Sequence, residues 1–185
     1  MDGADTTARF CGPTGIAIDP RTDGRDLLVT DHSSDKLRRV RLTGGHDAPP
    51  GARAVVKTLA SDLSGIRSIS SYCPIADCFY ATMWGSNQVC QLKVNPSEDT
   101  AQATRIAGAE DGASGSANGS GGEARFHNPR AVEVSSTGEV YVGDTRNHVV
   151  RRLVRPDPSS MTCTVTTLCG STSGKCEEGT PPAGH

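Results

Sequence analysis

The chain has 185 residues, a length typical of a single domain. Its 19 basic and 21 acidic residues give a net charge of −2, which excludes a general electrostatic attraction to nucleic acids or anionic membranes. No stretch is apolar over the length that spans a bilayer, and residues 1–10 lack the apolar core of a signal peptide, so we expect no membrane partner. The compartment stays open, because seven cysteines are many for a cytosolic chain.

Residues 8–60 predict the first of several similar β units. Apolar, β-branched segments at 13–19, 27–31, 36–40 and 55–60 are separated by Gly, Pro, Asp and Ser, the residues that favour turns. Val and Ile suit such strands because branched side chains pack well on a pleated surface. We therefore expect four short antiparallel strands in this part of the chain.

Two further units repeat this pattern. Residues 79–83 and 86–92 take the places of the two middle strands in the second unit, and residues 140–144 and 147–153 do so in the third. The three units align without a gap over equal separations: Leu28 to Val40, Tyr80 to Leu92, and Tyr141 to Leu153. A fourth strand closes each unit, at 55–60, 104–108 and 165–170.

Four short strands in a repeat of this length are typical of one β-propeller blade. The predicted fold class is therefore all-β, a propeller segment of about three four-stranded antiparallel blades that form an incomplete ring. The segment spans 1–185 as one domain and divides into blade one (8–60), blade two (61–108), a Gly/Ser loop (109–123), blade three (124–170) and the start of a truncated next repeat (171–185). We expect burial at Ile16, Ile18, Leu28, Val29, Leu37, Ile66, Ile69, Tyr80, Val89, Val132, Val134, Tyr141, Val142 and Val150, with some exposure where blades one and three are open.

The chain resembles the NHL-repeat propeller family from about Ala8 to Gly170. The strings ARF, VYVGDTRNHVVRRL and IAGAEDG carry the resemblance, and Asn147-His148 supplies the first two letters of the signature. Blade one departs from it with Ser34-Asp35, and blade two with Ser86-Asn87 and Met83. The resemblance implies a protein-interaction scaffold without catalysis. It leaves two alternatives open, a fragment of a six-bladed metal-dependent lactonase or amidating lyase, and an RNA-binding propeller.

Residues at equal places in the repeats are expected to have structural roles. They are Phe10, Phe126, Pro13, Pro129, Asp31, Asp144, Asn147 and His148. The two aspartates end the second strand of their blades. We expect Asp144 to accept backbone N–H groups of the turn at 145–147, and Asp31 to do the same near Ser33.

No catalytic, metal-binding or cofactor-binding residue is predicted. Among the five histidines, only His32 and His148 stand near the ends of inner strands, and no histidine recurs across the blades to form a converging triad.

Two basic clusters stand on equivalent third strands, and their six members are Arg38, Arg39, Arg41, Arg151, Arg152 and Arg155. They are interpreted either as outward-facing blade surface or as a patch for RNA or an acidic partner. Nucleic acid is weakly supported, because aromatic residues that could stack on bases are scarce.

Cys73 and Cys78 flank the turn 74–77 and could form a disulfide across a hairpin, or remain reduced, depending on the compartment. Three blades also leave two open edges. We expect these edges to be covered by further blades of a parent chain, by another subunit or by a second copy in a homodimer.

Overall fold

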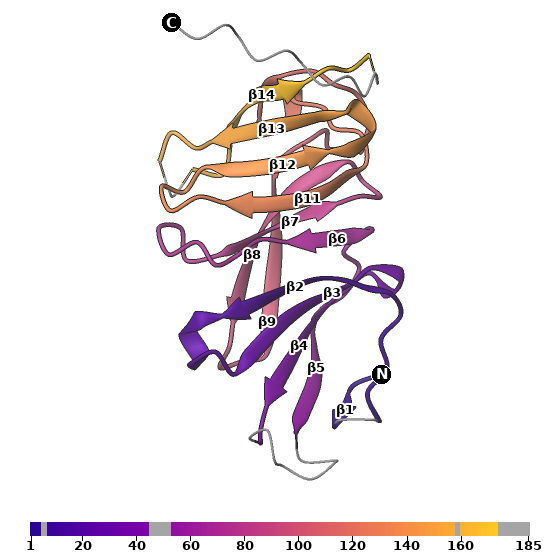
Figure 1. Ribbon diagram of the computed structural model, residues 1–185, viewed down its shortest axis with the longest axis vertical. Coiled ribbons are helices and arrows are strands. Elements are labelled where there is room, and N and C mark those ends of the chain that lie inside the picture. Colours follow the sequence, from indigo (N-terminus) through magenta and orange to yellow (C-terminus); the bar gives the residue numbers. More distant parts are fainter. Residues whose placement is uncertain (5–6, 45–52, 158–159, 174–185) are drawn as a thin grey trace, which may run out of the picture.

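A computed structural model describes residues 1–4, 7–44, 53–157 and 160–173 (Figure 1). These residues form three antiparallel sheets stacked along the longest axis, with the indigo and purple blade one at one end and the orange blade three at the other. No α-helix occurs in the described part of the chain, and its sheets do not close a ring, which confirms the predicted all-β propeller segment. The predicted truncated repeat lies largely outside the described residues.

Blade one is a five-stranded sheet in the order β1-β5-β4-β3-β2. Its strands are β1 (Gly3–Ala4), β2 (Pro13–Asp19), β3 (Asp26–Asp31), β4 (Lys36–Leu42) and β5 (Ala54–Ala60). The four longer strands are the expected ones, and β1 is an addition that pairs with the outer strand β5, Gly3 opposite Val56. Short 3-10 turns, η2 (Pro20–Thr22) and η3 (His32–Ser34), follow β2 and β3.

Blade two is a four-stranded sheet in the order β6-β7-β8-β9. Its strands are β6 (Ile66–Ile69), β7 (Phe79–Met83), β8 (Gln88–Asn95) and β9 (Thr100–Ala107). An isolated bridge between Cys73 and Cys78 extends the first hairpin beyond β6. Blade two lies between the other two blades and packs on both (Figure 1).

Blade three has five strands in the order β10-β14-β13-β12-β11. Its strands are β10 (Gly119–Ser120), β11 (Pro129–Val134), β12 (Val140–Asp144), β13 (Val149–Val154) and β14 (Thr164–Gly170), with the 3-10 turns η4 (Gly121–Glu123) and η5 (Thr145–Asn147). The predicted Gly/Ser loop therefore contains structure. Gly119 pairs with Val165 of the outer strand, and Ser120 and Glu123 form a reciprocal capping box.

The inner strand of every blade begins with the same irregularity. A β-bulge interrupts the register at the start of β2, β6 and β11, and its extra residues are Thr14, Arg67 and Arg130. A bulge bends its strand and changes the direction of the side chain that it carries. The three bulges therefore place one variable residue at the same point of each blade.

The apolar core lies between the blades and forms two clusters. One is centred on Leu28, Leu37 and Phe79 between blades one and two, and the other on Tyr80 and Val142 between blades two and three. Most of the expected core residues are buried. Ile16, Ile18 and Val150 are exposed, and Tyr141 is half-buried, because they face away from blade two at the two ends of the stack.

Candidate interaction surface

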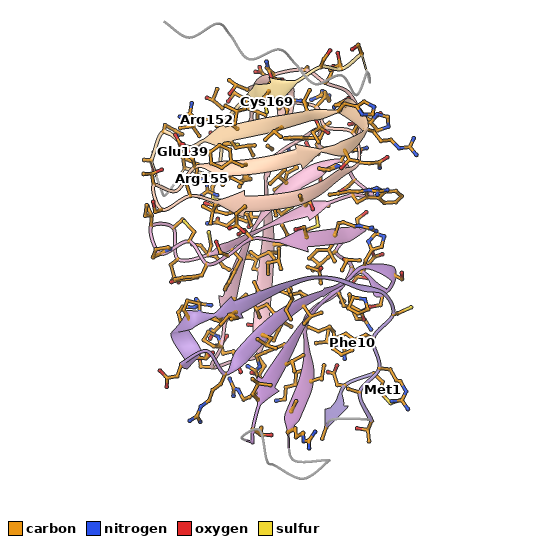
Figure 2. The ribbon with its side chains drawn as sticks, viewed as in Figure 1. Met1, Phe10, Glu139, Arg152, Arg155 and Cys169 are labelled. Atoms are coloured by element: carbon orange, nitrogen blue, oxygen red, sulfur yellow. The ribbon has the colours of Figure 1, made fainter. Side chains whose placement is uncertain are left out.

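A segment that we call the clasp lies across the outer edge of blades one and three. The clasp of blade one comprises residues 1–10, of which 5–6 are outside the described residues, and the clasp of blade three comprises residues 117–126. Each contributes the extra two-residue strand and then leads into the inner strand of the same blade. Figure 2 shows Met1 and Phe10 of the first clasp beside blade one.

A buried arginine holds each clasp. In blade one, Arg38 Nη2 donates to Met1 O at 2.9 Å and to Asp2 Oδ1 at 2.9 Å, and Nη1 donates to Arg9 O at 3.1 Å. Its guanidinium carbon lies 5.0 Å from the centre of the Phe10 ring. Hydrogen bonds to charged donors and cation–π contacts are strong where water is excluded, so Arg38 joins three points of the clasp to β4.

Blade three repeats these contacts with different residues. Arg151 Nη2 donates to Ala117 O at 2.8 Å and to Asn118 Oδ1 at 3.0 Å, and Nη1 donates to Arg125 O at 3.2 Å. The guanidinium carbon lies 5.3 Å from the centre of the Phe126 ring. The phenylalanines at equal places in the repeats are therefore the aromatic partners of these two arginines.

The backbone donors expected for the repeated aspartates, Asp31 and Asp144, are wrong. Asp144 Oδ1 accepts from His127 N at 2.8 Å, and Oδ2 accepts from Asn147 Nδ2 at 2.8 Å and Arg151 Nη1 at 3.1 Å. The backbone N–H of Cys11 takes the place of His127 N at Asp31, 2.7 Å from Oδ1. The backbone donors come from the segment before the inner strand, and not from the turn as expected. The turn supplies side-chain donors, Asn147 Nδ2 to Asp144 and Ser34 Oγ to Asp31 at 2.7 Å, and the next strand supplies an arginine.

Burial raises the pKa of Asp144, and its hydrogen bonds to Asn147, His127 and Arg151 oppose the shift. The carboxylate is thus enclosed by donors and is unavailable to a ligand.

The predicted arginine patch is also wrong for its central members. Arg38, Arg39 and Arg151 are buried, and each forms an ion pair with a carboxylate inside the fold. The remaining three are engaged as well. Arg41 pairs with Asp26 at 2.7 Å, Arg152 with Glu139, and Arg155 lies over the ring of Tyr80.

The remaining repeat residues lie at strand starts and turns. Pro13 and Pro129 are the first residues of β2 and β11, where a missing N–H does not interrupt a ladder. Asn147 is buried and donates to Gly115 O at 2.6 Å, while His148 has the left-handed backbone, with φ of 57°.

Cys73 and Cys78 are buried free thiols, and the disulfide considered from their spacing is not formed in this structure. Their backbones exchange both hydrogen bonds of an antiparallel pair, at 2.8 and 3.3 Å. Such pairs are close enough for a disulfide, so the pairing stays a prediction for an oxidising compartment. Burial raises the pKa of the Cys78 thiol, which slows its oxidation.

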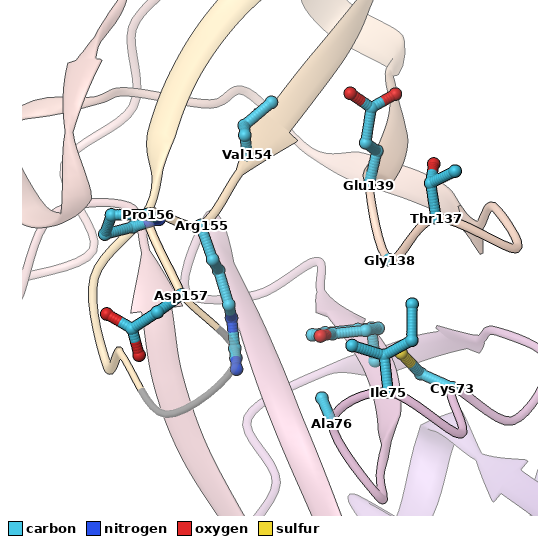
Figure 3. Close-up of a pocket in the computed structure, with 11 residues that line it drawn as sticks. Cys73, Ile75, Ala76, Thr137, Gly138, Glu139, Val154, Arg155, Pro156 and Asp157 are labelled. Atoms are coloured by element: carbon cyan, nitrogen blue, oxygen red, sulfur yellow. The ribbon is translucent and has the colours of Figure 1, made fainter.

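A cavity of about 150 Å³ opens next to these thiols, between blades two and three (Figure 3). Figure 3 shows the Arg155 side chain extending into it, with Glu139 and Thr137 on the far side. Ligand pockets for metabolites usually measure about 300–1,000 Å³, so this cavity is small for an organic substrate.

A different surface carries the accessible polar groups, and we call it the turn face. It consists of the turns after the second strand of each blade (32–35, 84–87 and 145–148) and the starts of the inner strands, with the bulge residues Thr14, Arg67 and Arg130. These segments lie together because Pro13 pairs with Asp31, Ile66 with Met83, and Pro129 with Asp144.

The turn face crosses the blade junctions. The His32 ring lies edge-on to the Trp84 ring at 5.7 Å, and its Nδ1 is 3.1 Å from Ile66 O. Asn128 Nδ2 donates to Trp84 O at 3.1 Å. Side chains of neighbouring blades therefore fix one another, which makes this surface rigid.

Three arginines supply the positive charge of the turn face. Arg67, Arg130 and Arg146 form no ion pair with any described residue. Arg130 and Arg146 are exposed, and Arg67 is half-buried. These three arginines and Trp84 are not among the predicted site residues. For Arg67 and Arg130 the sequence signal is their position, because each of them, like Thr14, follows the first residue of an inner strand.

The structure does not bring the histidines of interest together. His32 and His148 belong to blades that are separated by blade two, and His32 is held by Ile66 and Trp84. Within the described ranges, no three His, Cys, Asp or Glu side chains form a group that could hold a metal ion. None of the helices in the described residues is long and apolar enough to cross a membrane.

No family model and no curated protein sequence matches the chain. Solved structures do resemble it. An auxiliary nutrient binding protein from Bacteroides ovatus matches with a TM-score of 0.60 and 17% identity, over 86% of this chain and 36% of that one. Virginiamycin B lyase from Staphylococcus aureus matches with a TM-score of 0.53 and 11% identity, over 94% and 46%.

A calcium-containing structure of a Trichoderma reesei carbohydrate-active enzyme of family AA12 matches with a TM-score of 0.52 and 14% identity, over 82% of this chain and 37% of that one. The chain thus spans less than half the length of these three structures. Identities this low show the fold alone, and the resemblance places the chain among β-propeller-like proteins.

Proposed function

We propose that the chain is part of an NHL-type propeller that binds a protein partner through the turn face, with the blades as rigid support. One observation carries the proposal. The three turns share a left-handed residue at the same place, Asp35, Asn87 and His148, with φ of 52°, 53° and 57°. The side chains that they present nevertheless differ, as His32, Trp84 and Thr145 do at one shared position. A fixed scaffold with variable side chains suits recognition.

The charge of this surface indicates the chemistry of the partner. Arg67, Arg130 and Arg146 have no acidic partner among the described residues, whereas Asp31 and Asp144 are enclosed by donors. Arg binds carboxylates with a planar fork of N–H groups and is enriched at interfaces, as Trp is. An acidic protein surface is therefore the ligand that the turn face fits best.

The experiment compares two exposed double variants with equal changes in charge. Arg130→Glu/Arg146→Glu reverses the turn face, and Arg25→Glu/Lys93→Glu reverses two exposed cations elsewhere. In quantitative affinity capture from the cells that make the protein, we expect the first variant to lose acidic proteins that the wild type and the second variant retain. A polyglutamate peptide, titrated at low and high salt, serves as a defined acidic probe.

Three outcomes would contradict this proposal. Equal capture by all three proteins would show that the turn face does not bind the partner. Loss of capture after nuclease treatment, with a salt-dependent gel shift, would favour the RNA-binding alternative. Hydrolysis or elimination activity on lactone substrates, dependent on an added divalent metal ion, would favour the enzyme alternative.

A further inference from the structure

The outward face of blade one resembles an uncovered internal junction. Ile16 stands at the position of Ile69 in blade two and Val132 in blade three, according to the registers with β3, β7 and β12. Ile69 and Val132 are each 6% exposed because the preceding blade covers them, whereas Ile16 is 65% exposed. Ile18 is 58% exposed, and its counterpart Val134 is 9% exposed.

The outward face of blade three shows the complementary deficiency. Val150 stands at the position of Leu37 and Val89, which are 0% exposed because the following blade covers them, while Val150 is 36% exposed. Tyr141 stands at the position of Leu28 and Tyr80, which are fully buried, and is itself half-buried. Among the described residues, no blade covers the outward face of blade three or that of blade one.

The turn face contains a hydrogen bond that joins consecutive blades, and we call it the latch. At the first junction, Asp35 Oδ1 accepts from Gly65 N at 2.6 Å. At the second, Asn87 Oδ1 accepts from Asn128 N at 2.8 Å. Both acceptors have the left-handed backbone after the second strand, and both donors immediately precede an inner strand with φ of 67° and 49°.

Each half of a third latch is present at an end of the stack. His148 has the acceptor's backbone, with φ of 57°, and its exposed side chain has no hydrogen-bond partner among the described residues. Gly12 has the donor's place before β2, with φ of 87°. A neutral imidazole accepts one hydrogen bond, so His148 can act where Asp35 and Asn87 do.

We propose that a second copy of this chain covers both faces. Blade three of one copy packs on blade one of the other through Val150 and Ile16, and His148 accepts from Gly12 of the partner copy. The relation that joins blade one to blade two, and blade two to blade three, thereby continues across the two copies. Because both copies offer both faces, a two-fold axis produces two identical junctions and closes a ring of six blades.

Two observations favour a second copy over an unrelated partner. The two open faces are the two sides of one repeated junction, so the chain carries its own complement. The fold match to virginiamycin B lyase covers 94% of this chain but 46% of that one, which fits an arrangement about twice this size. The proposal is independent of the partner bound by the turn face.

Sedimentation velocity on the purified chain over a micromolar concentration series tests this assembly. We expect a species of twice the 19.3 kDa of one chain. Ile16→Asp and Val150→Asp should each give monomers, while the control Met161→Asp, at a residue of similar exposure outside both faces, should still dimerise. Circular dichroism of all variants excludes unfolding as the cause.

Mixing the two face variants distinguishes head-to-tail pairing from contact between identical faces. A 1:1 mixture of Ile16→Asp and Val150→Asp retains one intact junction per pair, so it should form a heterodimer weaker than the wild-type dimer. Contact between two blade-one faces would instead leave Val150→Asp dimeric, and it would overturn the proposal.

The latch has its own test with variants that leave the apolar faces intact. His148→Ala removes one acceptor at each of two junctions and should weaken dimerisation about 5- to 150-fold. His148→Asn installs the residue of blade two and should restore it. The proposal is wrong if the wild type is monomeric throughout, which would leave the faces to blades of a longer parent chain. It is equally wrong if species larger than dimers form, or if His148→Ala dimerises like the wild type.

Discussion

The buried pair of Asp144 and Arg151 should be worth several kcal/mol to blade three. Arg151→Met keeps much of the side-chain volume and leaves the buried Asp144 carboxylate with two donors, His127 N and Asn147 Nδ2. Removing one partner of a buried ion pair usually costs about 3–5 kcal/mol. For a chain of this length, the loss lowers the melting temperature by about 6–20 °C.

Blade two supplies the matched control for this prediction. Met83 and Cys90 stand at the positions of Asp144 and Arg151, and blade two also lacks a clasp. The double variant Asp144→Met/Arg151→Cys therefore copies a pair that this chain already uses. We expect it to be more stable than the sum of its two single variants, Asp144→Met and Arg151→Cys, predicts, by a coupling free energy of about 1–3 kcal/mol.

Urea unfolding at fixed protein concentration measures the free energies of unfolding. Hydrogen exchange measures the protection of the backbone amides in the clasp. Arg151→Met should lose amide protection over 117–126, because the arginine binds Ala117, Asn118 and Arg125. Losses below about 1 kcal/mol in both single variants, strictly additive effects, or unchanged protection of the clasp would refute the reasoning.

Three further predictions concern other parts of the fold. Hydrogen bonds from Lys57 and Arg39 hold the pKa of Asp99 below its usual value, so Asp99→Asn should lower the free energy of unfolding at pH 7. The difference from the wild type should fade as the pH falls through the lowered pKa of Asp99, and a difference that persists in strong acid would contradict this. Burial raises the pKa of Cys90 to about 12 and of Cys163 to about 11. A thiol reagent at pH 8 should therefore modify the exposed Cys11 and Cys169 first, and equal rates of modification at all four cysteines would contradict the described burial. Gly65 has φ of 67°, and a Cβ there would lie 2.6 Å from Gly85 N. Urea unfolding should therefore show that Gly65→Ala lowers the free energy of unfolding by about 1–3 kcal/mol. The control Gly122→Ala should change it little, because the nearest neighbour of a Cβ at Gly122 would be the flexible end of the Arg105 side chain.

The propeller could be predicted from the sequence because strand period and turn residues recur at equal spacing. The equality of Leu28–Val40, Tyr80–Leu92 and Tyr141–Leu153 corresponds to paired strands in all three sheets. The extra strands β1 and β10 gave no such signal. They are two residues long and begin with glycine, and their pairing depends on an outer strand more than 40 residues later.

The partners of the repeated polar residues could not be predicted for a related reason. Asp31 and Asp144 were assigned to their own turns because short-range hydrogen bonds are the common case for aspartate. The backbone N–H groups that they accept from lie about 17 to 20 residues earlier, at Cys11 and His127. The arginines of the third strand read as surface because a charged residue is rarely fully buried unless it is paired, and the pairing is visible only in three dimensions.

Because of the clasp, the sequence repeat and the folded blade begin at different residues. The inner strand β11 begins at Pro129, yet the outer edge of the same blade is completed by Gly119 and Ser120, which precede it. Blades one and three can therefore complete their outer edges only when their clasps, upstream of the inner strands, are carried with them. A duplication, deletion or exchange whose boundary lies at the start of an inner strand would separate such a blade from its clasp. A cut before the clasp would move the blade and its fastening together.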